Sequence, residues 1–284
     1  MSNKIALLVD SGMDLPTEII AKEGVYVIPL NIIYKDHVYI DKVTITSKEI
    51  YDRLETEVPS TSLPDGQAIH DILEQIIADG YTQLIVGTIS SGLSGTNNML
   101  NLMVKDFPQL ESFVLDTKSI GIGGGVQGYY AKRLIDEGLT FAEITKKLTA
   151  HVSDSRVFFS IPTLEYLKKG GRIGLVSSIL GTALNLNPVI SCNTDGIYHT
   201  VSKARGRKRS IEKMLSAVEE FIGNHPAYDI GVAYGNCIDE ARELAEVVKQ
   251  RFPNCQKLFF DEVSPALGIH TGPGVIGMGV QLRD

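Results

Sequence analysis

The segment Ile89-Ser90-Ser91-Gly92-Leu93-Ser94-Gly95-Thr96 follows a short apolar run at residues 84–88 and precedes a helix predicted over residues 96–105. A second segment, Val58-Pro59-Ser60-Thr61-Ser62-Leu63-Pro64, also lies just before a predicted helix, which Asp65 opens. Both segments are rich in hydroxyl groups and free backbone N–H groups. A helix N-terminus favours negative charge through its dipole and its unpaired donors. The two segments therefore predict a site for a small anion, either a carboxylate or a phosphate.

Strand-like and helix-like segments alternate through the first half of the chain. Strands are expected at residues 4–9, 25–34, 38–40, 84–88 and 113–115. Helices are expected at residues 15–21, 46–54, from Asp65, at 96–105, 121–137 and from Thr140 to near Val152, with capping boxes at Thr46/Glu49 and Thr140/Glu143. This alternation indicates a largely parallel sheet with helices on both faces, and ligands in such folds bind beyond the carboxyl ends of the strands. Asp10-Ser11, Thr61 and Ser94 are expected at that edge.

The second half of the chain has a different order of elements. Strands are expected at residues 157–161, 188–191, 197–203, 230–233, 258–261 and 275–282, and helices at 164–168, 209–222 and 239–252. Asn193-Thr194-Asp195-Gly196 predicts a hairpin turn. His270-Thr271-Gly272-Pro273-Gly274 is interpreted as a tight loop between two strands. We therefore expect an α/β domain over residues 1–155 and an α+β domain over residues 156–284.

Composition narrows the class of protein. The 284 residues are 43% hydrophobic and 21% charged, with a net charge of −7 and a pI of about 5.4. This acidic balance disfavours a general nucleic-acid partner. The sequence has no signal-peptide pattern and no apolar run of membrane-spanning length, so stable membrane insertion is not expected. Cys192, Cys237 and Cys255 are widely spaced, which predicts a reduced, cytoplasmic protein without a disulfide framework or zinc site.

Of two possible catalytic or cofactor motifs, the first is matched incompletely and the second lies in the wrong structural context. Gly92 lies two residues before Ser94, but Thr96 stands where a nucleophile elbow would have its second glycine. His270 could act as the base for Ser94, although the spacing reveals no orienting acid. A serine esterase or a transferase acting on a phosphorylated metabolite therefore stays open as the alternative function. The Gly123-x-Gly125-x-x-Gly128 pattern falls inside a predicted helix, where close helix packing explains it better than dinucleotide binding.

Dense positive charge is confined to the second half of the chain. The two basic runs are Lys168-Lys169-Gly170-Gly171-Arg172 and Lys203-Ala204-Arg205-Gly206-Arg207-Lys208-Arg209. In an acidic chain, such runs can steer a phosphate or an acidic partner protein. Arginine suits an oxyanion because its guanidinium is a planar fork of donors.

Five motifs, taken in order, resemble the DegV family of bacterial fatty-acid-binding proteins. They are Asp10-Ser11, Thr61-Ser62-x-Pro64, Ser90-Ser91-Gly92-Leu93-Ser94-Gly95-Thr96, Lys169-Gly170-Gly171-Arg172-Ile173 and His270-Thr271-Gly272-x-Gly274. The resemblance extends over the whole chain. It departs from the family pattern at Leu63, where glutamine is frequent, and at Gly12, where serine or threonine is usual.

The resemblance implies a two-domain fold that holds one long-chain fatty acid, of the C16–C18 class, between the domains. It implies that hydroxyls of Thr61 and Ser94 hold the carboxylate, with His270 nearby; Ser62, Gly95 and Thr271 complete the implied ligand-binding set. It also implies a non-catalytic protein without a further cofactor, which hands the acid to a fatty acid kinase for acyl-phosphate formation in phospholipid synthesis. Arg205 and His270 are implicated in that encounter, with Arg172 in support.

Simple energetics agree with different roles for the acyl tail and the carboxylate head group. About 15 methylenes contribute about 0.8 kcal/mol each when buried, and association costs offset part of that gain. The tail therefore dominates affinity and the head group contributes orientation. Neutral hydroxyls would leave one carboxylate oxygen accessible for phosphorylation, whereas a buried arginine pair would shield it. This argument favours Thr61 and Ser94 as direct ligands and Arg205 as a rim residue that faces the partner.

Overall fold

The first of two large sheets is entirely parallel. The computed structural model describes residues 4–179 and 186–284, and this sheet has the order β2-β1-β6-β7. Its strands are β1 (Ile5–Asp10), β2 (Val25–Ile28), β6 (Gln83–Thr88) and β7 (Glu111–Asp116). Every residue of β6 is buried, because helices cover both faces of the sheet. This explains the continuous apolar run seen in the sequence.

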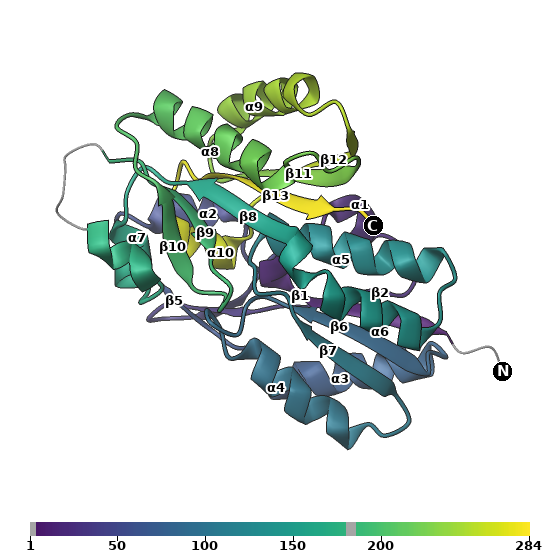
Figure 1. The fold of residues 1–284 in the computed structure, drawn as a ribbon. Coiled ribbons are helices and arrows are strands. Elements are labelled where there is room, and N and C mark those ends of the chain that lie inside the picture. Colours follow the sequence, from purple (N-terminus) through teal and green to yellow (C-terminus); the bar gives the residue numbers. More distant parts are fainter. Residues whose placement is uncertain (1–3, 180–185) are drawn as a thin grey trace.

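Helices enclose the parallel sheet from two sides. On one face lie α3 (Gly66–Ala78) and α4 (Thr96–Met103), which share a hydrophobic cluster with alternate residues of β1 and β6. On the other face lie α5 (Ile122–Asp136) and α6 (Phe141–Ala150). Figure 1 shows α5 and α6 between the parallel sheet and the second sheet.

The second sheet is mixed and has six strands in the order β10-β9-β8-β13-β11-β12. Its strands are β8 (Ser155–Ser160), β9 (Val189–Cys192), β10 (Tyr198–Ser202), β11 (Tyr228–Tyr234), β12 (Cys255–Glu262) and β13 (Ile276–Leu282). Among the described strand pairs of this sheet, β11–β12 is the only parallel one. Helices α8 (Arg207–Ile222) and α9 (Ile238–Arg251) cover its outer face with a separate hydrophobic cluster. The expected α/β half followed by an α+β half is confirmed.

Helix α5 packs closely against its neighbours, as its glycines predict. A Cβ at Gly123 would lie 2.5 Å from Val157 Cβ, and one at Gly125 would lie 2.5 Å from the Asp14 carbonyl oxygen. At Gly128 it would lie 2.7 Å from Leu15. Close packing therefore explains the dinucleotide-like spacing. Because α5 touches both sheets, one hydrophobic cluster contains residues of both halves, and the domain division near residue 155 stays a prediction.

A third, three-stranded antiparallel sheet has the order β4-β3-β5, with β3 (Asn31–Ile33), β4 (Val38–Ile40) and β5 (Ser60–Ser62). Two local predictions are wrong. The first placed Thr61 in a loop before a helix, but Thr61 lies in β5 and pairs with Ile32. The second correction concerns His270, which lies in the last turn of α10 (Pro265–Thr271). Pro265 stands at the start of α10, where its missing N–H costs no hydrogen bond.

Other local predictions are confirmed. Thr46 and Glu49 form the capping box of α2 (Ser47–Arg53), and Thr140 and Glu143 form that of α6. The Asp65 carboxylate caps α3, and residues 193–196 connect the antiparallel strands β9 and β10. The remaining helical segments are η1 (Ser11–Met13), α1 (Thr17–Ile20), η2 (Val104–Asp106), η3 (Val152–Asp154), α7 (Glu165–Lys169) and η4 (Gly174–Ile179). Within the described residues, no helix is both long and apolar enough to cross a membrane.

Candidate functional site

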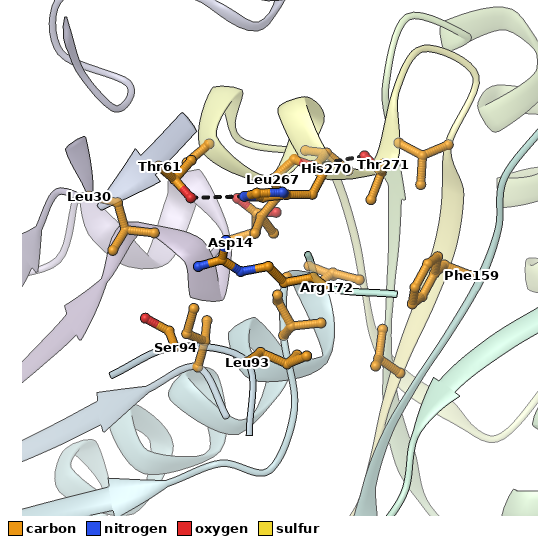
Figure 2. Close-up of a pocket in the computed structure, with 18 of the residues that line it drawn as sticks. Asp14, Leu30, Thr61, Leu93, Ser94, Phe159, Arg172, Leu267, His270 and Thr271 are labelled. Atoms are coloured by element: carbon orange, nitrogen blue, oxygen red, sulfur yellow. Dashed lines mark hydrogen bonds between the residues drawn. The ribbon is translucent and has the colours of Figure 1, made fainter. Parts of the chain in front are cut away.

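A cavity of about 270 Å³ lies where α10, β5, the N-terminal end of α5 and the inner face of the six-stranded sheet meet (Figure 2). Most of its lining is apolar. The apolar residues are Leu30, Leu63, Ile89, Leu93, Ile120, Ile122, Val157, Phe159, Ala233, Val263, Ala266, Leu267 and Val275. The polar and charged residues are Asp14, Thr61, Ser62, Ser94, Arg172, Tyr198, His270 and Thr271. The arrangement suits an apolar molecule with one polar group.

Thr61 and His270 meet at the cavity although 209 residues separate them in sequence. The Thr61 Oγ1 atom lies 2.8 Å from His270 Nε2, and Figure 2 shows the pair on one side of the cavity. Thr61 faces inward because side chains alternate along β5, whereas Ser60 and Ser62 are exposed. His270 comes from the last turn of α10 and is buried.

The environment of His270 holds its imidazole neutral. Burial, and then the positive charge of Arg172, lower the pKa of His270 to about 4. At neutral pH the ring therefore carries one proton, and one nitrogen donates while the other accepts. Its Nδ1 atom is buried without a hydrogen-bond partner among the described residues, so the ring presents a single paired nitrogen, Nε2, to Thr61.

Replacing Arg172 by glutamine is expected to raise the pKa of His270, because the repulsive charge is removed while burial is retained. The rise stops short of the ordinary histidine value, since burial is the larger of the two causes. An NMR titration of the imidazole resonances measures the change. Lys168→Gln is the matched control, because Lys168 is an exposed cation of the same basic run. An equal pKa in wild type and Arg172→Gln would contradict this account.

Ser94 stands at the N-terminus of α4, whose N-cap is Gly95. Its Oγ atom lies 2.8 Å from Thr96 Oγ1 and accepts a hydrogen bond from the Thr96 N–H. The Ser94 backbone is held in a turn by its N–H, which donates to the Ser90 carbonyl. Both Ser94 and Gly95 line the cavity, so this predicted pair and the Thr61–His270 pair border the same space.

The other predicted residues divide into two groups. Ser62 and Thr271 line the cavity, but the Ser62 hydroxyl donates to the Leu63 carbonyl and that of Thr271 to the Leu267 carbonyl. Arg172 also lines the cavity, and its Nη1 donates to the Gly170 carbonyl at 2.7 Å. Figure 2 shows its guanidinium reaching into the space beside Thr61 and Ser94. Arg205 is exposed and is not among the cavity residues.

The Asp10-Ser11 motif ties loops together. The Asp10 carboxylate accepts the N–H groups of Gly12 and Ile89, at 2.9 and 2.8 Å, and the Ser11 hydroxyl accepts the N–H of Leu30. Burial raises the pKa of Asp10 to about 7, although both backbone donors oppose the shift. This motif therefore positions the segment that starts at Ile89 and does not itself line the cavity.

Two further carboxylates hold the helix that carries His270, and both lay outside the sequence prediction. Asp14 accepts the Ser264 N–H at 3.1 Å and pairs with Lys42 at 2.9 Å. Asp41 accepts the Ala266 N–H at 2.9 Å. Both carboxylates are buried. Asp14 binds the N–H of the N-cap residue of α10, and Asp41 binds an N–H of its first turn. The sequence does not indicate that Asp14 and Asp41 contact α10, because this helix lies more than 220 residues further along the chain.

The apolar wall was also missed. Phe159 and Tyr198 pack edge to face with ring centroids 5.3 Å apart, and both line the cavity. Alternation along β8 places Phe159 on the inner face of the sheet, and this period-2 pattern was the available signal. The pattern identifies buried residues, but it does not distinguish a cavity wall from a filled core.

The site offers donors for a carboxylate but does not assemble a serine triad. Ser94 pairs with Thr96, whereas His270 pairs with Thr61. Neither nitrogen of His270 contacts a carboxylate in the described part of the chain. Within residues 4–179 and 186–284, no cluster of histidine, cysteine and carboxylate groups could hold a metal ion. The observed contacts therefore give the esterase hypothesis no support.

Comparisons with known proteins agree with one another. The family model described as an uncharacterised protein of the DegV family matches residues 4–283. A DegV domain-containing protein from Clostridium acetobutylicum is 41% identical over 275 residues, covering 97% of this chain and 98% of the relative. A DegV domain-containing protein from Staphylococcus aureus is 32% identical over 278 residues, covering 98% of each.

Solved structures share the whole fold. A fatty-acid-binding DegV family protein from Thermus thermophilus has a TM-score of 0.92 at 29% identity, over 99% of this chain and all of that chain. A stearic-acid-binding protein from Eubacterium ventriosum has a TM-score of 0.87 at 27% identity, over 98% of both chains. A full-length family match, relatives above 30% identity and this shared fold lead to one conclusion: the chain belongs to the DegV family.

Proposed function

We propose that this protein binds one long-chain fatty acid, with the acyl chain in the cavity and the carboxylate beside Thr61 and Ser94. The observation that carries the proposal is an apolar cavity bordered by hydroxyls, a neutral imidazole and one guanidinium. The solved relatives described above bind fatty acids. A tail of the C16–C18 class supplies most of the affinity, at about 0.8 kcal/mol per buried methylene.

The hydrogen-bond geometry supports a specific role for His270. The Thr61 hydroxyl has one proton, which it can give either to His270 or to a ligand. When neutral His270 is protonated at Nε2, it donates to Thr61 Oγ1 and leaves the hydroxyl proton free for a carboxylate oxygen. Ser94 is arranged in the same way, because Thr96 can donate to Ser94 Oγ. Each hydroxyl is then a directed donor, and Arg172 adds positive charge nearby.

We further propose that the protein presents the bound acid to a fatty acid kinase in the cytoplasm and has no catalytic activity of its own. Arg205 is exposed outside the cavity, which suits a rim residue that contacts the kinase. Hydroxyl donors hold the carboxylate without covering both oxygens, so one oxygen is free to attack the phosphoryl donor. Arg172 lines the cavity beside these hydroxyls and is only partly buried. Its Nη1 already donates to the Gly170 carbonyl, so it adds positive charge without a bidentate pair that would cover both oxygens.

Replacing Thr61 by valine is expected to weaken fatty-acid retention about tenfold, because a hydrogen bond to a charged group contributes about 1.5 kcal/mol. Arg205→Ala is expected to retain the acid and to reduce turnover by the kinase. Retention is measured by mass spectrometry of a solvent extract, and turnover by acyl-phosphate formation with purified kinase. Thr200→Val is the matched control, since the Thr200 hydroxyl is buried without a partner and lies outside the cavity. Reversed effects of the two variants would overturn the assignment.

The same extract tests the alternative function. A stoichiometric long-chain acid in the extract supports the carrier proposal. An extract without lipid, together with Ser94-dependent hydrolysis of a generic ester, would instead establish the serine esterase.

A further inference from the structure

The Tyr198 hydroxyl stands apart from the other hydroxyls that line the cavity. Each of the others has a hydrogen-bond partner within the described part of the chain; they belong to Thr61, Ser62, Ser94 and Thr271. The Tyr198 hydroxyl makes no hydrogen bond to any described residue. Tyr198 is 3% exposed, so bulk solvent does not supply a partner either. A molecule in the cavity is therefore the partner that this hydroxyl can reach.

Tyr198 lies on the side of the cavity away from the proposed carboxylate position. It belongs to β10 and packs edge to face on Phe159 of β8, with ring centroids 5.3 Å apart. Figure 2 shows Phe159 across the cavity from Thr61 and Ser94. A fatty acid held by its carboxylate at Thr61 and Ser94 would therefore pass Tyr198 with its chain and not with its head group.

The surroundings of Tyr198 keep its hydroxyl protonated. Burial, and then the neighbouring Cys192 thiol, hold the pKa of Tyr198 well above its ordinary value, and the positive charge of Arg172 opposes this rise. A protonated phenol presents one O–H donor and an oxygen that can also accept. Because it carries no charge, it suits a neutral oxygen atom on a ligand.

An unsubstituted acyl chain leaves this donor without a partner. A hydroxyl buried against hydrocarbon loses its hydrogen bond to water and gains none in return. Phenylalanine would form the same wall without that loss, as Phe159 does beside it. A chain that carries an oxygen atom opposite Tyr198 removes the loss and adds a hydrogen bond.

We propose that Tyr198 is a second recognition point of the acyl cavity, which favours long-chain fatty acids that carry a hydroxyl or keto group where the chain passes it. This inference rests on the proposed function and adds a preference within it. An oxygen at the matching carbon accepts the Tyr198 O–H. The same oxygen elsewhere on the chain meets the apolar lining and loses its hydration, so the preference depends on its position.

The test compares stearic acid with stearic acids that carry one hydroxyl or one keto group at successive carbons, by competition binding. In wild type, one position is expected to bind about tenfold more tightly than its neighbours along the chain. Tyr198→Phe removes the donor and keeps the ring. It is expected to abolish this gain and to bind unsubstituted stearic acid at least as tightly as wild type. The substituent with the larger gain identifies the preferred group.

Tyr34→Phe is the matched control. Tyr34 is also 3% exposed, its hydroxyl is buried without a partner among the described residues, and it lies outside the cavity lining. This variant is expected to keep the wild-type dependence on the position of the oxygen.

The inference is overturned if no position gains affinity in wild type, or if the gain persists in Tyr198→Phe. It is also overturned if Tyr198→Phe loses stearic acid as strongly as the oxygenated acids, because Tyr198 would then hold the carboxylate. A wild-type protein that binds neither stearic acid nor any substituted acid would instead overturn the proposed function.

Discussion

Replacing Gly170 by alanine is expected to displace His270 and to cost the protein most of its ligand retention. A Cβ at Gly170 would lie 2.1 Å from His270 Nδ1, far inside a normal contact. The backbone itself tolerates alanine, because Gly170 has φ −78° and ends α7 in helical geometry. The imidazole must therefore rotate away, which breaks its contact with Thr61. Overpacking of this kind costs about 1–3 kcal/mol, and we expect retention to fall at least tenfold.

Retention is measured by mass spectrometry of extracts, and stability by thermal unfolding. Gly66→Ala is the control, since a Cβ there meets no atom closer than 3.8 Å and a helical alanine is favourable. Gly170→Ala in a His270→Ala background removes the clashing ring, so its effect on stability should largely disappear. An additive effect of the two substitutions would show that Gly170 does not act through His270.

Replacing Asp41 by alanine is expected to loosen α10 and to lower both stability and retention. The substitution leaves the Ala266 N–H buried without its acceptor, which lies 2.9 Å away in wild type. An unsatisfied buried donor costs about 1–3 kcal/mol. Because α10 carries Leu267, His270 and Thr271 into the cavity, we expect faster amide exchange in α10 and weaker fatty-acid retention. Both are measured on the full chain, by hydrogen exchange and by extract analysis.

Asp41→Asn separates the acceptor from the charge. Asparagine supplies an oxygen to Ala266 N–H, so α10 should stay protected and retention should recover. Burial raises the pKa of Asp41 to about 6, against the opposing hydrogen bonds from Ser11 and Ala266. The folded carboxyl therefore holds its proton more tightly than the unfolded one. The contribution of Asp41 to wild-type stability falls as the pH rises from about 4 to about 6, because the carboxyl ionises first in the unfolded state.

The asparagine variant lacks that contribution. Its free energy of unfolding relative to wild type should increase between pH 4 and pH 6 and stay constant above, as denaturant titrations at several pH values would show. If Asp41→Asn were as unstable as Asp41→Ala at every pH, the role assigned to the Asp41 oxygen would be contradicted. Equal retention in Asp41→Ala and wild type would show that α10 needs no anchor from the first half of the chain.

Much of the fold followed from local sequence signals. The capping boxes at Thr46 and Thr140 depend on residues three apart, and both helices begin where expected. The two central strands of the parallel sheet, β1 and β6, were recognisable as short apolar runs, since they are buried on both faces. The glycines of α5 were correctly attributed to close packing. Neighbours in sequence supply the interactions of the capping boxes, whereas the apolar runs and the glycines are local patterns that mark burial and close approach.

Two local predictions at the site were wrong for one reason. Thr61 was assigned to a loop because serine, threonine and proline are common there, but pairing with β3 makes it a strand. His270 was assigned to a loop because of Gly272 and Gly274, but these glycines follow a helix whose N-cap and first-turn N–H groups bind Asp14 and Asp41. Distant partners overrode the local preference in both segments.

Local sequence patterns specify most of the helices and strands, the alternation that builds a parallel sheet, and the hydroxyl-rich segments that mark a polar site. Those features depend on backbone conformation and on burial along a single element, which the order of residues encodes directly. The contact between His270 and Thr61, and the space that Gly170 leaves for the imidazole ring, exist only in the folded chain. These are contacts between segments far apart in the chain, and the packing of whole layers sets their distances.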